Sequence, residues 1–588
     1  MEQNLICRKA VEEIKKNDGR YSTMTRVIAL ILALVMTMAL VACGGDKPTT
    51  STPGTTPSTP SDPAKSSEPA VDPEAARYGG EFIMCSNNAT NTMDTHDGFG
   101  SLGNQRWMIH IFENLGVLGL DGNVYSEICD YEQSADGLTM KFTLRECYFS
   151  NGKKVTIDDV WASIQRVAGQ STSANWDKVW KGTSIQMDDK SITFTLEKTN
   201  VNFLDSFCNA GGSYKVMPKE ICDKYPVTGG ELQDNGLIRG GKLETKISEV
   251  ADVIGTGPYK LESYSDENVV MVRNDKYTIV DNGVTEGPAA PKEAYADKIT
   301  IAINRNADSR SAAVIAGEYD MGMVSTAMMP AAVAAGYQKL DQGTTWTHGI
   351  FFNLDESNAD SPIANVNVRK AIRAAIDCNA VLLALTGEEA ANVLHPYPVV
   401  TTSPYHNTII SDGEWSIADQ ALAKEYLAAA NYNGEAISWL VPANNNMYTI
   451  AMGAIPQLEA VGIKIDLMVV DSGSHSNLRK DPKTGHDIGA WNVQKQDVNP
   501  VLHSTFVTGT QGWWSSDTRT AAIEKMQTNP TGSAASIEGY KEWCQAVVDE
   551  CPFLLFGHVV NYNFVKPDVV WNVQGSREYY WNVYREVK

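Results

Sequence analysis

The residues of this sequence that are suited to chemistry point to ligand binding rather than to covalent catalysis. The chain has no Gly-x-Ser-x-Gly, no His-Glu-x-x-His and no Walker loop, the motifs that hold nucleophiles, catalytic zinc and nucleotide phosphates. Its nine histidines are dispersed, and His475 lies in a polar stretch with no nucleophile signature nearby. A secreted glycosidase needs only two suitably separated carboxylates, so that enzyme class stays open as the alternative.

Two adjacent aromatic residues, Trp513 and Trp514, follow Gly512 and precede a helix that we expect to start near Thr518. Adjacent side chains on an extended segment point in opposite directions. We therefore expect one tryptophan to pack inward and the other to contact a ligand, without knowing which.

A polar run follows the first expected strand. Gly79 to Cys85 reads as a short apolar strand, and Ser86, Asn87 and Asn88 come directly after it. Open α/β sheets bind ligands outside the carboxyl ends of their strands. Asn87 and Asn88 are therefore candidate ligand contacts.

The cysteines and histidines do not form a recognisable metal site. The ten cysteines include no Cys-x-x-Cys pair, and no His/Cys cluster has the spacing of a metal site. We expect no metal and no cofactor. Cys7 and Cys43 lie near the start, and for the eight cysteines from Cys85 to Cys551 both disulfides and buried free thiols remain open.

Length and composition describe a large soluble globular protein. The chain has 588 residues, 43% of them hydrophobic and 20% charged, which allows several substantial cores. Its formal net charge is −22, and a dispersed acidic excess repels phosphate backbones and anionic lipid headgroups. Nucleic-acid binding is therefore not expected.

The first 42 residues look like a secretion leader. Val27 to Ala42 is a 16-residue run without a charge, preceded by Arg20 and Arg26. It is short for a membrane span but suits the apolar region of a signal peptide. The run ends in Leu-Val-Ala-Cys-Gly, which looks like a bacterial lipobox, so Cys43 is the candidate lipidation site. A leader with a chance cysteine is the alternative, and Met24 is a candidate true start.

A tether follows the leader. From Asp46 to about Arg77 the chain consists mainly of Thr, Ser, Pro and Ala, too little apolar surface to offset the entropy of ordering. We expect an extended linker, spanning residues 43–78 with the anchor, between the membrane and the globular part.

The rest of the chain interleaves strands and helices. Leu138 to Leu144 alternates apolar and polar residues, as in a half-buried strand. Thr156 with Asp159 three residues later predicts a capped helix start. We expect three further helices and a strand that follows a helix-ending Gly462, over residues 366–385, 417–430, 450–461 and 462–467. The expected class is α/β.

Several motifs, in order along the chain, resemble the family 5 extracellular solute-binding proteins, the oligopeptide-, dipeptide- and nickel-binding lipoproteins of ABC importers. The resemblance covers Tyr78 to about Lys588. It rests on Glu113–Gly122, Ala135–Arg145, Phe149–Val160, Gly255–Leu261, Arg273–Tyr277, Gly317–Asp320, Asn353, Val366–Ile372, Ala375–Asp377 and Pro552.

The resemblance implies a type II periplasmic-binding fold, with two α/β lobes joined by a hinge and a subdomain inserted in the first lobe. Closure about the hinge would bury a ligand between the lobes. The hinge would lie near residues 344–345 and 556–557. Mapped onto this chain, lobe one spans 79–112, 245–344 and 556–588, the inserted subdomain 113–244, and lobe two 345–555.

The resemblance also assigns roles to residues. Asp497 matches an aspartate that pairs with the α-ammonium of bound peptides, which suits the need of a buried ammonium for a charged partner; a turn-forming aspartate is the alternative. Trp491, in the same segment, is a further candidate contact, as are Trp346 and His348 beside the expected hinge. Arg369 is expected to hold its helix against neighbouring segments.

The function implied is that of a lipid-anchored receptor outside the cytoplasmic membrane. It captures a small ligand, closes over it and delivers it to the permease of an ABC importer, without catalysis. A short peptide is the first expectation, because extended backbones offer donors and acceptors to strand edges. An oligosaccharide or a nickel chelate is the alternative ligand, a structural surface lipoprotein is the alternative class, and a monomer is expected.

Overall fold

The computed structural model describes residues 74–98, 101–170, 173–388, 392–393, 396–399, 401, 403–443, 446–494, 499–502, 507, 511–571 and 577–586. All of them belong to one compact unit, residues 71–588. The candidate leader, Cys43, residues 44–73 of the expected tether and Asp497 lie outside the described residues. The end of the tether is described, and it forms a short 3-10 helix over Ala75–Arg77 where an extended chain was expected. Among the described residues, no helix is both long and apolar enough to cross a membrane.

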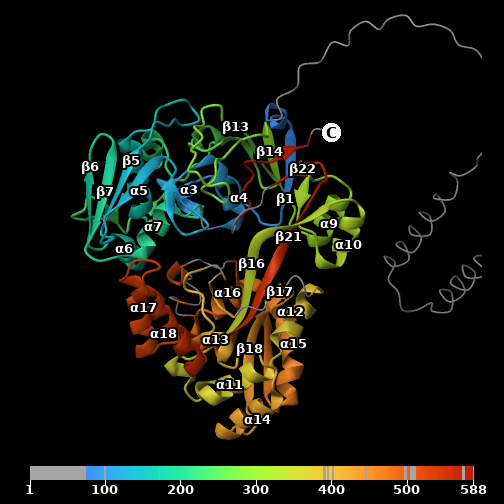
Figure 1. Ribbon diagram of the computed structural model, residues 1–588. Coiled ribbons are helices and arrows are strands. Elements are labelled where there is room, and N and C mark those ends of the chain that lie inside the picture. The colour runs from blue at the N-terminus through green and yellow to red at the C-terminus, as the bar shows by residue number, and fades with distance from the viewer. Residues whose placement is uncertain are drawn as a thin grey trace, which may run out of the picture. The chain divides into compact units, whose positions relative to one another are not determined.

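An eleven-stranded sheet runs through the described part of the chain (Figure 1). Its strand order is β12-β13-β14-β1-β15-β21-β16-β20-β18-β19, and β17 pairs with β21. The strands are β1 (Glu81–Ser86), β12 (Tyr259–Tyr264), β13 (Asn268–Arg273), β14 (Lys298–Ile303), β15 (Met321–Gly322), β16 (Gln338–Phe352), β17 (Asn392–Val393), β18 (Ala436–Pro442), β19 (Lys464–Val470), β20 (Ile488–Gln494) and β21 (Phe553–Val565).

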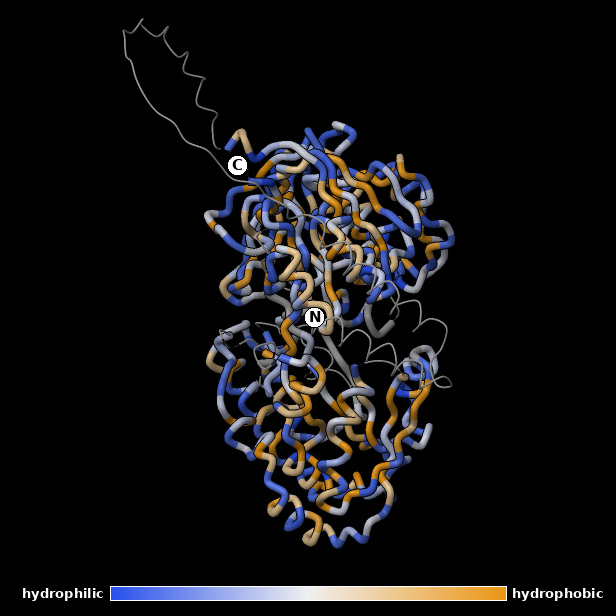
Figure 2. Tube along the Cα trace, turned by 90° about the vertical axis from the view of Figure 1, so that its right-hand side faces the viewer, coloured by the Kyte–Doolittle hydropathy of each residue, from blue (hydrophilic) through white to orange (hydrophobic). Residues whose placement is uncertain are grey.

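The two ends of this sheet belong to separate hydrophobic cores. We call each core, together with the strands and helices that pack on it, a lobe. The first lobe holds β12, β13, β14, β1 and β15, and the second holds β20, β18 and β19. In Figure 2 hydrophobic stretches run inside both lobes and hydrophilic ones lie in their outer loops. β1 is parallel to β14 and β15, and β18 is parallel to β19 and β20, so in each lobe several strand carboxyl ends meet at one edge.

Two long antiparallel strands, β16 and β21, pass from one lobe into the other. Their pairing is irregular at two places, between Asp341 and Thr345 and between His348 and Gly349, where Phe556 on β21 is left out of the register. β-Bulges of this kind bend a strand locally. Both irregularities lie close to the residues expected as hinges, 344–345 and 556–557.

A second sheet, with order β4-β5-β7-β6, forms a subdomain with its own core. Its strands are β4 (Cys129–Gln133), β5 (Thr139–Leu144), β6 (Thr183–Met187) and β7 (Ser191–Leu196). Short pairs complete the strands: β2 (Gly116–Leu118) with β3 (Val124–Ser126), β8 (Val227–Thr228) with β11 (Lys242–Leu243), β9 (Glu231–Leu232) with β10 (Ile238–Arg239), and β22 (Val569–Val570) with β23 (Tyr584–Arg585).

Helices cover the sheets. Those of the first lobe and the subdomain are α3 (Thr95–Gly98), α4 (Leu102–Ile111), α5 (Ile157–Gly169), α6 (Ser173–Trp180), α7 (Val201–Cys208), α8 (Lys219–Lys224), α9 (Ala307–Ile315) and α10 (Met329–Ala334). Those of the second lobe are α11 (Val366–Ala375), α12 (Cys378–Thr386), α13 (Ile409–Asp412), α14 (Gln420–Ala429), α15 (Asn446–Ala460), α16 (Ser472–Leu478), α17 (Asp517–Gln527) and α18 (Ala534–Glu550).

The expected helix over residues 366–385 is wrong as a single element. The chain is extended at Ile376, and the side chain of Asp377 accepts a hydrogen bond from the N–H of Ala380 at 3.0 Å, starting a new helix. The apolar spacing carried across this break because both helices bury their faces in the same core. The other expected helices and strands are present with shifted ends, and Gly462 follows α15 with φ +94°.

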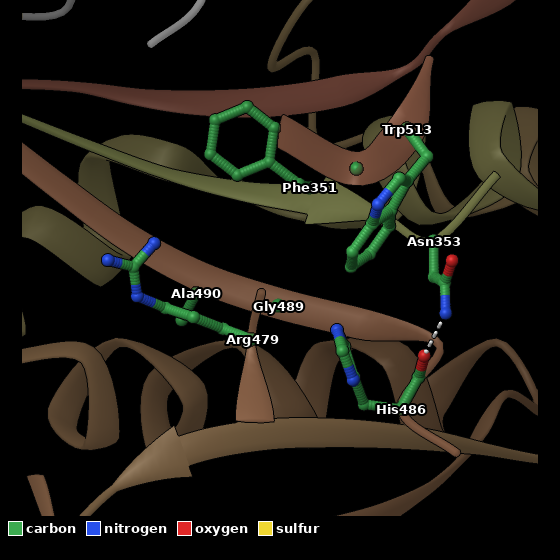
Figure 3. A pocket seen from close by; sticks show the side chains of 8 residues that line it. Phe351, Asn353, Arg479, His486, Gly489, Ala490 and Trp513 are labelled. Atoms are coloured by element: carbon green, nitrogen blue, oxygen red, sulfur yellow. Dashed lines mark hydrogen bonds between the residues drawn. The ribbon is translucent and has the colours of Figure 1, made fainter. Parts of the chain in front are cut away.

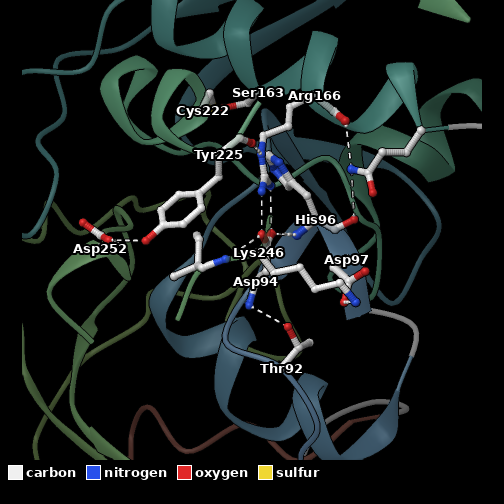
Figure 4. A network of polar contacts seen from close by, with 12 residues as sticks. Thr92, Asp94, His96, Asp97, Ser163, Arg166, Cys222, Tyr225, Lys246 and Asp252 are labelled. Atoms are coloured by element: carbon white, nitrogen blue, oxygen red, sulfur yellow. Dashed lines mark hydrogen bonds and ion pairs between the residues drawn. The ribbon is translucent and has the colours of Figure 1, made fainter. Parts of the chain in front are cut away.

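A buried ion pair fastens the subdomain helix α5 to the segment around α3 (Figure 4). Arg166 donates two hydrogen bonds to the carboxylate of Asp94, at 2.7 and 2.5 Å, and both side chains are almost fully buried. The backbone N–H groups of His96 and Ile247 also donate to Asp94. Burial alone would raise the pKa of Asp94, but the hydrogen bonds and charge of Arg166 outweigh it and the pKa is lowered.

The expected scaffolding role of Arg369 is confirmed, and the open question of the cysteines is answered. The buried guanidinium of Arg369 donates to the carbonyl oxygens of Ile363, Ala364, Glu550 and Cys551 at 2.6 to 3.2 Å, which ties α11 to the end of α18. The eight cysteines from Cys85 to Cys551 are buried free thiols, so the question of disulfides is decided in favour of thiols.

Candidate functional site

The carboxyl end of β1 forms a polar edge in the first lobe. Ser86 ends the strand, and its hydroxyl exchanges 3.1 Å hydrogen bonds with the backbone of Asn88. Arg106, on α4, donates to the Ser86 hydroxyl at 2.6 Å and to the side-chain oxygen of Asn87 at 3.0 Å. Asn87 and Asn88 are half-buried, so the edge keeps polar groups within reach of solvent.

Arg106 is in turn held by a carboxylate from the end of the chain. Its Nε lies 2.5 Å from Glu578, which also accepts hydrogen bonds from Asn563 at 3.3 Å and Tyr580 at 3.1 Å. Sequence reasoning missed Arg106 and Glu578, since they are 472 positions apart. Only the fold brings them together.

A second guanidinium supports the same edge. Arg310, on α9, donates to the carbonyl oxygens of Asn304 at 2.9 Å and Met323 at 3.1 Å, after the ends of β14 and β15. Burial raises the pKa of Cys85, the residue before Ser86, to about 11, although the charges of Arg310 and Arg106 lower it in part. The strand ends therefore carry two cationic side chains, one of them neutralised by Glu578.

The second lobe contributes its own strand ends. β19 ends at Val470, and Asp471 then caps α16 by accepting hydrogen bonds from the N–H groups of Gly473 and Ser474. Asp497, the expected ammonium partner, lies three residues beyond the end of β20 and outside the described residues. Trp491 lies within β20, but its side chain is not among those described.

The two adjacent tryptophans separate as expected into one inward and one outward residue. Trp514 is buried, and its ring N–H donates to Glu550 at 2.6 Å. Trp513 is half-buried and has φ +55°. Trp514 therefore belongs to the core of the second lobe in this structure, and Trp513 is the one that remains accessible.

Trp513 lines a small pocket in the second lobe (Figure 3). Opposite it lie the ring of His486, 5.9 Å away between centroids, and the side chain of Arg479. The other lining residues are Phe351, Asn353, Gly489, Ala490 and Gly512. Phe352, between the lining residues Phe351 and Asn353, pairs with Ile488 at the start of β20, whereas Trp346 pairs with Gln494 at the end of β20. The pocket and Trp346 therefore lie at opposite ends of β20.

Trp346 and His348 lie on β16 between the two lobes. Trp346 is half-buried, whereas His348 has no exposed surface. Burial lowers the pKa of His348 to about 4, so its imidazole is neutral at physiological pH. The structure thus brings these two residues together and keeps them apart from Trp513.

A metal site has little support in the described part of the chain. No three of its His, Cys, Asp and Glu side chains form a group that could hold a metal ion.

The segment from Gly255 to Gly257 superficially suggests a phosphate loop, but it packs on the end of α4. An added Cβ at either glycine would lie within 2.5 Å of a backbone oxygen of that helix.

Comparison with known proteins decides the family. The model of the bacterial extracellular solute-binding proteins, family 5, matches residues 124–513. This chain belongs to that family. The resemblance seen in the sequence is confirmed, and so is the two-lobed type II fold.

Three known proteins are similar to this chain over most of its length. Heme-binding protein A of Haemophilus influenzae is 25% identical over 484 residues, covering 76% of this chain and 81% of the relative. DppA of Helicobacter pylori, solved with the peptide STSA, is 20% identical with a TM-score of 0.65, covering 87% of this chain and 99% of DppA. NikA of Brucella suis, solved with Fe(III)-EDTA, is 18% identical with a TM-score of 0.68, covering 86% and 100%.

Family membership establishes the general role. The chain is an extracytoplasmic solute-binding protein of an ABC importer, a receptor and not an enzyme. Its partners are a small-molecule ligand and, as the family implies, the importer's permease.

Proposed function

We propose that this family 5 receptor is anchored to the outer face of the cytoplasmic membrane by a lipid on Cys43 and captures short peptides by closing its two lobes. Closure is driven by the ligand, because only a molecule that contacts both lobes stabilises the closed state over the open one. The closed receptor then presents the peptide to the permease. It acts as a monomer.

The polar edge at the end of β1 is the observation that carries the ligand class. Asn87 and Asn88 are half-buried and offer amide groups beside Arg106, which suit the alternating donors and acceptors of an extended peptide. Asp497 on the second lobe supplies the charge for the peptide's α-ammonium. The proposal keeps the lobe boundaries predicted from the sequence and takes the two register irregularities of β16 and β21 as the hinges.

Heme is a second candidate ligand, favoured by the similarity to heme-binding protein A of Haemophilus influenzae. The two ligands are distinguished by mass spectrometry of the purified receptor, first native and then denatured. Release of a series of short peptides supports the proposal. A single released species with the mass and absorbance of heme contradicts the peptide assignment and supports the second candidate.

The anchor is tested separately by metabolic labelling with a radioactive fatty acid. We expect label in the wild-type protein and none in Cys43→Ser, which should leave the membrane fraction. Label retained by Cys43→Ser contradicts the anchor without touching the ligand assignment.

A further inference from the structure

Two histidines on the crossing strands have opposite surroundings. His558, on β21, is buried and has a partner at each ring nitrogen: the hydroxyl of Thr347 lies 2.8 Å from Nδ1 and the carbonyl oxygen of Tyr397 lies 3.0 Å from Nε2. His348, on β16, is also fully buried, yet neither of its ring nitrogens has a hydrogen-bond partner among the residues that the structure describes. The fold therefore supplies hydrogen-bond partners to the ring nitrogens of His558 but not to those of His348.

The strand geometry explains why His348 is left alone. Neighbouring residues on a strand point to opposite faces, so Thr347 reaches His558 on one face and His348 lies on the other. Directly opposite His348 on β21 is Gly557, which has no side chain to offer a partner. On the other side of β16, the residue opposite His348 is Asn492 of β20, whose side chain is not among those described. Trp346, two positions away on the same face, is half-buried.

An orphaned imidazole is costly in a protein interior, because it has lost its bonds to water without gaining others. Such groups are uncommon in native structures and call for an explanation. Here the group lies on a strand that joins the two lobes, next to a register irregularity. A ligand held between the lobes is the natural source of the missing partner.

We propose that His348 is a ligand-binding residue, whose imidazole hydrogen-bonds a neutral peptide group of the captured ligand while Trp346 packs against the ligand's backbone. A neutral imidazole presents one donor and one acceptor, which match the C=O and N–H of a peptide. A neutral ring does not neutralise a charged ligand group, which would also pay the cost of burial. This inference rests on the proposed function, since it takes the ligand to be a peptide.

The test compares His348→Phe with His558→Phe and the wild type, each as the mature lipoprotein purified in detergent. Phenylalanine keeps a ring and removes the nitrogens. Urea denaturation measures stability, and calorimetry measures the affinity for the peptide best retained from a random tripeptide-to-pentapeptide library. For His348→Phe we expect the urea midpoint to stay or rise and the Kd to increase about 10-fold, the loss of one buried hydrogen bond. His558→Phe should instead lower the urea midpoint.

Two results overturn the inference. A clear loss of stability in His348→Phe shows that the imidazole has a structural partner, and an unchanged Kd shows that the ligand does not touch it. His348→Gln, which restores a donor and an acceptor, should recover part of the affinity. If the wild type retains no peptide at all, the proposed function fails and the inference fails with it. If the wild type and His348→Phe bind the peptide equally well, only the inference fails.

Discussion

At the scale of single residues, identical neighbours take different roles because the backbone directs them differently. Trp513 and Trp514 are adjacent, yet Trp514 donates its ring N–H to Glu550 in the core and Trp513 lines a pocket. Their sequence predicts opposite directions but not which ring points inward. The left-handed backbone at Trp513, with φ +55°, is the local feature that separates them.

Asp497 carries the sharpest prediction at this scale. Replacing Asp497 with Ala should weaken the binding of a free-amine peptide by about 2 to 5 kcal/mol, the range for removing one partner of a buried charge pair. Calorimetry with a peptide and with its N-acetylated form measures the effect, and Asp497→Ala should bind the acetylated form no more weakly than the wild type does, because neither charge is then left unpaired. Equal affinity of wild type and Asp497→Ala for the free-amine peptide would remove Asp497 from the site.

At the scale of elements, capping residues set where helices begin and end. Asp377 starts α12 after a single extended residue, which hydrophobic spacing alone did not reveal. Asp159 closes the start of α5 as expected: it accepts hydrogen bonds from the N–H and hydroxyl of Thr156 at 2.8 and 2.7 Å. Its other oxygen accepts from the N–H of Lys219 at 2.7 Å, at the start of α8.

Asp159→Ala should therefore lower the free energy of unfolding by about 2 kcal/mol, the upper range for a helix cap, since it leaves donors on two helices unpaired. The adjacent Asp158 is exposed, and Asp158→Ala is the matched control, with an expected change below about 0.5 kcal/mol. Urea denaturation measures both. Equal effects of the two substitutions would show that the cap contributes nothing specific.

At the scale of the whole molecule, an ion pair joins the two lobes beside the crossing strands. It links Lys339, on the first-lobe part of β16, with Glu388, which follows α12 of the second lobe. The ammonium of Lys339 also lies 4.0 Å from the centre of the Tyr562 ring. This arrangement favours the conformation seen here over one in which the lobes have rotated.

Glu388→Gln should shift the ratio of lobe conformations away from the present one by about 2- to 5-fold, the range for a partly exposed ion pair. Distances between spin labels on the two lobes measure the ratio. The matched control is Glu542→Gln, which breaks a comparable pair with Lys525 inside the second lobe and should leave the distances unchanged. Identical distance distributions for the wild type and Glu388→Gln would argue against this role.

Buried histidines make the stability of the whole molecule depend on pH. Burial lowers the pKa of His96 and His348 to about 4 and that of His110 to about 3, whereas the unfolded chain titrates near 6.5. Below pH 6.5 the unfolded state therefore binds protons that the folded state does not, and stability falls as the pH decreases toward 4. Glu113, whose pKa burial raises to about 6, acts in the opposite direction.

The free energy of unfolding should thus be lower at pH 5 than at pH 7, by about 2 kcal/mol for each such histidine. Urea denaturation at the two pH values measures the loss, and His110→Gln should reduce it. Equal stability at pH 5 and pH 7 would contradict the neutral, buried state of these rings.

The sequence by itself determined the family, the α/β class and the capped start of α5. These properties depend on local patterns: apolar periodicity, a Thr and an Asp three residues apart, and short motifs in a set order. Such patterns act within one or two turns of chain, so they can be read without knowing what lies alongside.

Only the tertiary structure decided which polar groups share an environment. Arg106 meets Glu578 across 472 positions, and the eight cysteines from Cys85 to Cys551 are free thiols. Among the described residues, His348 has no hydrogen-bond partner, whereas both ring nitrogens of His558 have one. Burial and hydrogen bonding at these residues depend on strands that pair over long distances in the chain. No local pattern encodes them, because the free energy of each group is set by neighbours that folding brings to it.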